Sequence, residues 1–409
     1  MTLSMKQTVF VLLLLIAAVA LFGVVDLLPK SLEQRADQII RSCARAPYVP
    51  SCYDERIPAL MDQGLSLEET FAVTRIVQDK TEGYFYCHIL GHKVAEKEVA
   101  KDPSQWTSVI ARCPSDVCSN GCLHGAAQER FRSESLTPEE LAGVVPELLN
   151  LCEPANGFSF TELERASCYH ALGHLSMFLA GGDVGGALGI CNQVAGRDGI
   201  DYETTCYEGT FMQIFQPLEP EDIALVRELP VGTQKDAEGF CDGFSGAASA
   251  ACHRESRPLY GTLDKPAELE HFCSLVPGET NKRDCYMAIL FTLAPYFDYD
   301  IDKLTTLCTG VPKERTAQCF SNAASRFVES DYRLAEEAVA LCGVAEAQGV
   351  GERCYHELLY YSTFVFHEGS TGFTALCSAL PEPWQTRCFA GEGKELRMFE
   401  GPTVSFPRS

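Results

Sequence analysis

The chain has 409 residues, with 33 Lys and Arg against 56 Asp and Glu, so its formal charge at pH 7 is −23. This balance excludes a surface that coats DNA or RNA, because phosphate binding requires a basic face. Hydrophobic residues make up 46% of the chain and charged residues 22%, a composition typical of globular rather than disordered proteins. The 20 cysteines are unusual at this length. They indicate either an oxidising compartment or an array of metal sites.

The first predicted element is an apolar run, residues 9–25, which follows Lys6 and ends before Asp26. At 17 residues the run is longer than a usual cleaved signal core and at the short limit of a membrane-spanning helix. We predict an uncleaved signal anchor at residues 1–28; cleavage after Ala20 is the alternative. With Lys6 inside, the positive-inside rule places the rest of the chain outside the cytoplasm, in the periplasm or at the cell surface. Both alternatives export the cysteines.

Eighteen of the cysteines fall into nine local pairs, each 9 to 16 positions apart. The pairs are Cys43/Cys52, Cys113/Cys122, Cys152/Cys168, Cys191/Cys206, Cys241/Cys252, Cys273/Cys285, Cys308/Cys319, Cys342/Cys354 and Cys377/Cys388. From Cys252 onward the second members follow one another at steps of 33 to 35 residues, a period typical of helical-hairpin repeats. Each pair is expected to form a disulfide across the turn of one hairpin, which stabilises a loop of this size by ~3 kcal/mol.

The residues around these pairs predict a helix on each side of the turn. Segments 304–308 (LTTLC), 338–342 (AVALC) and 373–377 (FTALC) each resemble the last turn of an amphipathic helix. The second cysteine, usually followed by Tyr or Phe, then begins the next helix. The sequence therefore predicts an all-α solenoid of about ten hairpins after the membrane helix. We expect an elongated rod whose repeats touch only their neighbours. We expect N-terminal repeats at 29–215, with a His-rich face, and C-terminal repeats at 216–409.

Cys87 and Cys118 lie outside this pairing rule. Cys87 is 35 residues from both Cys52 and Cys122, so it marks a further unit whose first helix, around 71–79, has no cysteine. We predict a disulfide between Cys87 and Cys118 that ties the second unit to the third. The alternative is that these two cysteines are reactive thiols.

Segments 269–288 and 304–323 resemble the disulfide-bridged members of the Sel1-like branch of tetratricopeptide-type repeats. In those proteins a short loop between two cysteines also precedes an aromatic residue and often Leu-Gly, as in segment 168–173 (CYHALG) of this chain. The resemblance touches most of residues 38–395. It implies a right-handed superhelix with a groove for a protein or peptide partner, and it implies no catalysis.

Five of the nine histidines lie in the early repeats, where one motif occurs twice. The motif H-x-L-G-H is found at 88–92 and at 170–174, and on a helix its two imidazoles share one face. If consecutive units stack, His124 and Glu208 occupy the matching places in two further units, on helices about 8–10 Å apart. The pattern predicts a metal site of a type that suits Zn, Cu or Fe. Its candidate ligands are His88, His92, His124, His170, His174 and Glu208.

The same histidines also have a structural interpretation, in which they recur because the repeat recurs and hydrogen-bond loop carbonyls or acidic groups of a partner. Four glycines fit this interpretation, because a missing side chain lets helices pack closely: Gly91, Gly125, Gly173 and Gly209. The zinc-protease, C-x-x-C, Walker and dinucleotide motifs do not occur, so no catalytic residue is assigned and the sequence argues against an enzyme.

Two functions remain open at this point. The first is a membrane-anchored, extracytoplasmic helical-repeat scaffold that binds a protein or peptide partner. The second is a metal-binding protein that holds Zn, Cu or Fe at the histidines and uses it as a metalloenzyme or as a carrier. The distances between the five early histidines in the folded chain are the observation that best separates the two.

Overall fold

Helices make up most of the protein, which is described here by a computed structural model. The structure describes residues 30–81, 87–114, 117–118, 121–131, 143, 148, 152–153, 160–197, 200–217 and 220–396. The predicted all-α class is confirmed for these residues. The anchor predicted at residues 1–28 lies outside the described residues. Within them, no helix combines the length and the apolar character that crossing a membrane requires.

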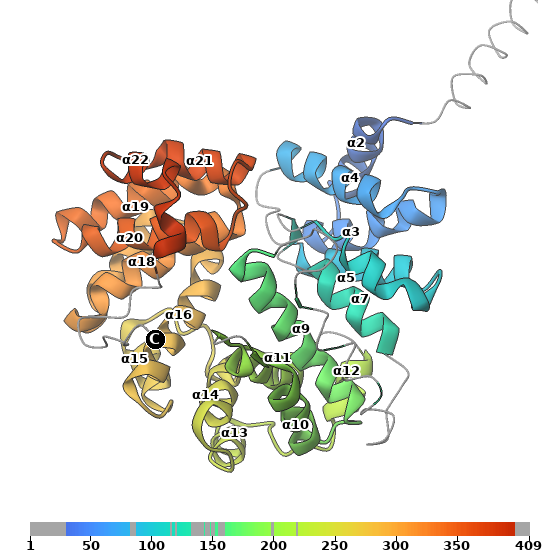
Figure 1. Ribbon diagram of the computed structural model, residues 1–409, viewed down its shortest axis with the longest axis horizontal. Coiled ribbons are helices and arrows are strands. Elements are labelled where there is room, and N and C mark those ends of the chain that lie inside the picture. Colours follow the sequence, from blue (N-terminus) through green and yellow to red (C-terminus); the bar gives the residue numbers. More distant parts are fainter. Residues whose placement is uncertain are drawn as a thin grey trace, which may run out of the picture.

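The elements follow one another as short helices joined by short turns (Figure 1). The helices of the first half are α2 (Leu32–Cys43), α3 (Val49–Arg56), η1 (Pro58–Gln63), α4 (Leu67–Lys80), α5 (His88–Val99), η2 (Pro103–Gln105), α6 (Trp106–Ile110), α7 (Gly121–Phe131), α9 (Glu162–Leu179), α10 (Val184–Val194) and α11 (Glu203–Phe215). A two-residue antiparallel ladder, β1 (Gly196–Arg197) with β2 (Ile200–Asp201), separates α10 from α11.

The later helices continue the same alternation. They are α12 (Pro220–Val226), α13 (Gln234–Cys241), α14 (Gly246–Glu255), η4 (Arg257–Tyr260), α15 (Pro266–Ser274), α16 (Glu279–Tyr296), α17 (Ile301–Gly310), α18 (Lys313–Ser330), η5 (Tyr332–Leu334), α19 (Ala335–Ala347), α20 (Gly351–Phe364), α21 (Thr371–Ala379), α22 (Trp384–Phe389) and η6 (Glu392–Glu395).

Local side chains determine where several of these helices begin. At α4, the Ser66 hydroxyl accepts from the backbone N–H of Glu69, and the Glu69 carboxylate accepts from the N–H of Ser66. Thr161 and Glu164 form the same reciprocal pair at the start of α9. Each such box satisfies two N–H groups that have no partner within the helix, and losing the cap costs about 1 kcal/mol. The start of α9, which carries the second H-x-L-G-H motif, is therefore set by its own sequence.

All 20 cysteines are paired, so the predicted disulfides are confirmed. Nine bonds close local loops with sequence separations of 9 to 16 and Cα–Cα distances of 5.3 to 5.7 Å. The tenth joins Cys87 to Cys118 over a separation of 31 residues. The alternative in which Cys87 and Cys118 are reactive thiols is wrong. This density of disulfides indicates an oxidising, extracytoplasmic environment.

The second helices of successive hairpins pack side by side in one continuous row: α5, α7, α9, α11, α14, α16, α18 and α20. Within the row α5 and α7 run parallel, because Gly121 faces the carbonyl of His88 and Gly125 faces the carbonyl of His92. Parallel neighbours bring the same position of each unit onto one side of the row. Residues that recur at one place in the repeat can therefore meet in space.

The row curves until its C-terminal end contacts the early helices. In Figure 1 the last helices, in orange and red, come round to the same side of the molecule as α2 and α4. Helix α20 packs against α9, where the Tyr360 hydroxyl donates to the Glu162 carboxylate at 3.1 Å. Arg333 forms an ion pair with Asp79 at 2.6 Å. The expectation of an elongated rod whose repeats touch only their neighbours is wrong, because small rotations between units add up along the row.

Two clusters of buried apolar residues form the core. The first extends from Ala36 to Cys252, and the second from Ala250 to Cys388. The first cluster continues well past residue 215, and the two meet near Ala250 on α14. The division of the repeats at 215/216 therefore stays a prediction.

Close packing between α9 and α11 requires glycine. A Cβ atom at Gly209 would lie 1.9 Å from the His170 carbonyl oxygen. Gly209→Ala is expected to force the helices apart and to lower the free energy of unfolding by about 1–3 kcal/mol, measured by urea denaturation.

Gly189, within α10, is the matched control, because a Cβ atom at this position would meet no packing neighbour within 4 Å. Gly189→Ala should raise the free energy of unfolding by about 0.5–1 kcal/mol, because alanine loses less backbone entropy in a helix. Equal effects of the two substitutions would contradict the assigned contact.

Candidate metal centre

Glycine contacts bring the helices of the histidine motifs unusually close. A Cβ atom at Gly121 would lie 2.1 Å from the His88 carbonyl oxygen, and one at Gly125 would lie 2.3 Å from that of His92. Between α9 and α11, a Cβ atom at Gly173 would lie 2.0 Å from the Cys206 carbonyl oxygen. Gly125 and Gly173 therefore act as predicted in the structural interpretation, because neither position leaves room for a side chain between the helices. Their effect is to bring the side chains on neighbouring helices together.

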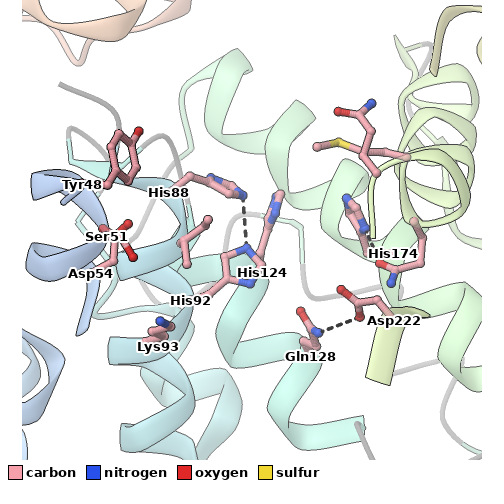
Figure 2. Close-up of a pocket in the computed structure, with 14 residues that line it drawn as sticks. Tyr48, Ser51, Asp54, His88, His92, Lys93, His124, Gln128, His174 and Asp222 are labelled. Atoms are coloured by element: carbon pink, nitrogen blue, oxygen red, sulfur yellow. Dashed lines mark hydrogen bonds between the residues drawn. The ribbon is translucent and has the colours of Figure 1, made fainter. Parts of the chain in front are cut away.

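Three imidazoles meet where α5 contacts α7. The ring centroid of His124 lies 4.8 Å from that of His88 and 5.4 Å from that of His92, and His88 and His92 are 4.8 Å apart. One nitrogen from each ring can be chosen so that all three lie within 4.8 Å of one another. All three side chains are buried. Figure 2 shows them converging between Tyr48 and Asp54 on one side and His174 and Asp222 on the other.

The second motif lies on the other side of His124. The His124 ring stacks on His170 with centroids 5.7 Å apart and lies 5.6 Å from His174. His170 and His174 are themselves 5.0 Å apart. His124 is thus the central ring of five, and α5, α7 and α9 each contribute to one cluster. We call these five residues the histidine cluster.

Within each motif the two Nε2 atoms face each other. The distance between them is 3.1 Å for His88 and His92 and 3.2 Å for His170 and His174. Two neutral imidazoles can approach this closely if one N–H donates to the other nitrogen, or if both nitrogens bind one cation. With metal–nitrogen bonds of 2.0–2.1 Å, adjacent ligands of one ion lie roughly 3 Å apart, so both spacings are suitable for shared coordination.

The cluster favours neutral imidazoles, the form that binds metal. The pKa of His124 lies well below its ordinary value, first because burial penalises the cation and then because the four neighbouring histidines repel it. Burial also lowers the pKa of His170, with a further contribution from His174. Burial lowers the pKa of His174, and a hydrogen bond to Gln213 opposes this effect.

Outer hydrogen bonds orient two of the rings. His124 Nε2 donates to the backbone carbonyl of Ser167 at 3.3 Å. His174 Nδ1 lies 2.7 Å from Oε1 of Gln213. Partners of this kind fix the tautomer and the ring orientation of histidines that bind metals.

A pocket of about 480 Å³ opens beside the cluster. Four of the five histidines reach it, and its other walls include Tyr48, Asp54, Lys93, Met212 and Asp222. Asp222 is buried and accepts a hydrogen bond from Gln128 Nε2 at 3.4 Å. The cluster is therefore accessible to a small molecule as well as to an ion (Figure 2).

Glu208 does not join the histidines as the sequence predicted. Its carboxylate accepts a hydrogen bond from the buried guanidinium of Arg254, on α14. It is part neither of the three-histidine group nor of the pocket wall. Helix α14 is the next helix of the row and packs on α11. Its Arg254 occupies the place in the repeat that matches Glu208, so Glu208 faces a cation there.

Two polar residues of the site were missed by the sequence reasoning. Gln213 is adjacent to Met212 but belongs to no recurring position, so it carried no signal. Asp222 lies on α12, within a longer stretch that does not follow the repeat. It reaches the pocket only because α12 folds back against α11.

The neutral histidines make the stability of the metal-free protein sensitive to acid. The pKa values of His124, His170 and His174 are lowered on folding, so the unfolded chain binds protons below about pH 6.5 that the folded chain does not. The free energy of unfolding therefore has its full value above that pH. It falls as the pH falls, by up to about 1.4 kcal/mol per pH unit for each such histidine.

Urea denaturation at about pH 7.5 and about pH 5.5 measures this effect. His124→Gln should show a smaller loss between the two pH values than the wild type. His271→Gln, at an exposed position on α15, should match the wild type. Parallel behaviour of all three proteins would contradict the assignment.

Comparison of the chain with family models, with curated proteins and with solved structures gives no match. The geometry of the site is therefore the basis for the functional argument.

Proposed function

We propose that the protein is an extracytoplasmic metalloprotein that binds Zn, Cu or Fe at the histidine cluster. The observation that carries this proposal is the convergence of five imidazoles from three successive helices, with Nε2 pairs at 3.1 and 3.2 Å. His88, His92 and His124 form its first ion site, since these three have ligand atoms within 4.8 Å of one another. Two ligands of one ion lie at most about 4.2 Å apart, so a small side-chain movement completes this site.

The donor set selects the class of metal. Imidazole suits Zn, Cu and Fe, whereas Mg and Ca prefer oxygen ligands. No thiol competes for the metal, because all 20 cysteines are in disulfides. Burial keeps the pKa of His124 low, so its lone pair is available at neutral pH. Three protein ligands leave a fourth coordination position, and the adjoining pocket provides room for water or a substrate there.

The wider proposal places this site in an anchored repeat protein. In it, residues 1–28 form a signal anchor, and the disulfide-linked hairpins form a right-handed solenoid of the Sel1-like type. The repeat arrangement is supported by the continuous row of helices from α5 to α20. It is also supported by His124 and His170, which lie at the same position of two successive units. The disulfides support an oxidising compartment, where a transition metal would meet no reduced cysteine.

Metal analysis of the untagged protein tests the proposal. The protein is produced in an oxidising compartment, stripped with chelator and titrated with Zn²⁺ and with Co²⁺, whose visible spectrum reports coordination. We expect stoichiometric binding that is weakened by 100-fold or more in His88→Ala/His92→Ala, since even outer partners of metal ligands contribute about 10–100-fold. His271→Ala, which removes an exposed histidine on α15, is the matched control and should bind as the wild type does. Binding that is equal in both variants would overturn the proposal.

Binding of a protein or peptide partner is the second candidate function. The observation that favours it is Tyr48, whose exposed fraction is 67% although it lies on the pocket wall. Exposed aromatic residues beside a pocket are typical of recognition surfaces. A metal-free protein that captures a partner, with capture lost in Tyr48→Ala, would favour this function over the first.

A further inference from the structure

We infer that a second metal ion binds between His170 and His174, separate from the ion held by His88, His92 and His124. This inference rests on the proposed function, which it extends from one ion to two. Its basis is the arrangement of hydrogen bonds around the two rings of α9.

The Nε2 atom of His174 presents its lone pair to Nε2 of His170. The Gln213 amide oxygen can only accept, so the His174 Nδ1 at 2.7 Å must donate, and its Nε2 then carries the lone pair. His170 Nε2 lies 3.2 Å from this nitrogen, a spacing close to the roughly 3 Å between adjacent ligands of one ion, so one cation can be bound by both rings.

One ion cannot serve all five imidazoles in this arrangement. Among the described residues, the group whose ligand atoms lie within 4.8 Å of one another contains His88, His92 and His124 but neither His170 nor His174. Ligands of a single ion lie at most about 4.2 Å apart. His124 Nε2 donates to the Ser167 carbonyl, which leaves Nδ1 as the one nitrogen of this ring that can bind an ion. An ion held by His170 and His174 is therefore separate from the ion of the first site.

The pocket supplies what a two-histidine site lacks. Asp222 is buried in the wall of the same pocket as His174, so the pocket beside the second ion contains a carboxylate. Gln213 is 3% exposed, and its Nε2 has no hydrogen-bond partner among the described residues. The same side chain lines the pocket, where Nε2 can donate to an oxygen ligand of the ion. The second ion is thus expected to bind water or a small oxyanion on its pocket side.

Counting bound ions tests the inference. The untagged, metal-stripped full chain is titrated with Co²⁺, passed through a desalting column and analysed for cobalt and protein. We expect two equivalents in the wild type and one in each of two variants, His88→Asn/His92→Asn and His170→Asn/His174→Asn. Gln213→Met should keep the count but weaken one of the two binding events by about 10–100-fold, since it removes an outer partner of a ligand. His271→Asn should retain two equivalents.

Each failure has its own signature. One equivalent in the wild type, lost only in the α5 variant, overturns the second ion and leaves the proposed function standing. One equivalent that is lost in either variant means a single shared ion, which also overturns the inference. No stoichiometric cobalt at all overturns both proposals. Far-ultraviolet circular dichroism of each stripped variant shows whether it is folded, and the Gln213→Met titration keeps the inference testable if a histidine variant is not.

Discussion

Replacing both Cys87 and Cys118 by Ser is expected to lower the free energy of unfolding by about 3–4 kcal/mol and to weaken binding of the first metal ion at least 10-fold. The stability term follows from the separation of 31 residues, the longest of the ten disulfides. The expected loss of metal affinity follows from the position of the Cys87–Cys118 disulfide. Cys87 directly precedes His88 at the start of α5, and the disulfide ties this point to the segment that leads into α7, which carries His124.

A second double variant provides the control. Cys377→Ser/Cys388→Ser removes the last disulfide, whose loop of 11 residues is stabilised by about 3 kcal/mol in the same loop-closure treatment. Its metal affinity should equal that of the wild type, because α21 and α22 carry none of the cluster. Both variants are compared by urea denaturation of the stripped protein and by Co²⁺ titration. Equal metal affinity in the two would show that the Cys87–Cys118 bond does not position the site.

Glu208→Gln is expected to lower the free energy of unfolding by about 3 kcal/mol without changing the number of bound metal ions. Arg254 has a side chain that is 1% exposed, so removing the charge of Glu208 leaves a buried cation with less compensation. Asp284 and Glu255 also act on Arg254, which is why we expect the lower end of the usual range. A reduced number of bound metal ions in Glu208→Gln would instead identify Glu208 as a ligand.

The reverse substitution should be milder. Arg254→Met places an apolar side chain of similar size in the buried site, and the partner left behind, Glu208, is 25% exposed and can turn to water. Two of the guanidinium nitrogens of Arg254 also have no hydrogen-bond partner among the described residues, so the native arrangement already contains an unfavourable contribution. We expect Arg254→Met to lower the free energy of unfolding by less than about 1.5 kcal/mol. The double variant Glu208→Gln/Arg254→Met should lower it by less than Glu208→Gln alone. Similar losses in both single variants would contradict this asymmetry.

The local features of the fold were predictable because they depend on residues close together in the chain. Cysteines 9 to 16 residues apart can reach each other across one helical turn-around, so spacing was enough to assign nine disulfides. His88 with His92, and His170 with His174, share a face by helix geometry alone. The tenth disulfide was predicted by elimination, since Cys87 and Cys118 were the two that remained.

The candidate site was predicted in part. The repeat placed His124 between the two motifs, and the structure brings the five rings together. The same argument placed Glu208 in line with them and was wrong about its role, because a repeat position says nothing about the neighbour that the next unit supplies. Gln213 and Asp222 could not be found from spacing, since each reaches the pocket through contacts between helices and not through the repeat.

By itself the sequence determined the disulfide pairing, the helical hairpins and the pairing of histidines within each motif, because each depends on chain geometry over a few turns. Tertiary structure alone decided that His124 lies between the two motifs at contact distance, that Arg254 engages Glu208, and that α20 returns to α9. These outcomes depend on how far each helical unit is rotated against the next. That rotation is set by side-chain packing between helices, including the close approaches at Gly125 and Gly209, and it accumulates over the whole row.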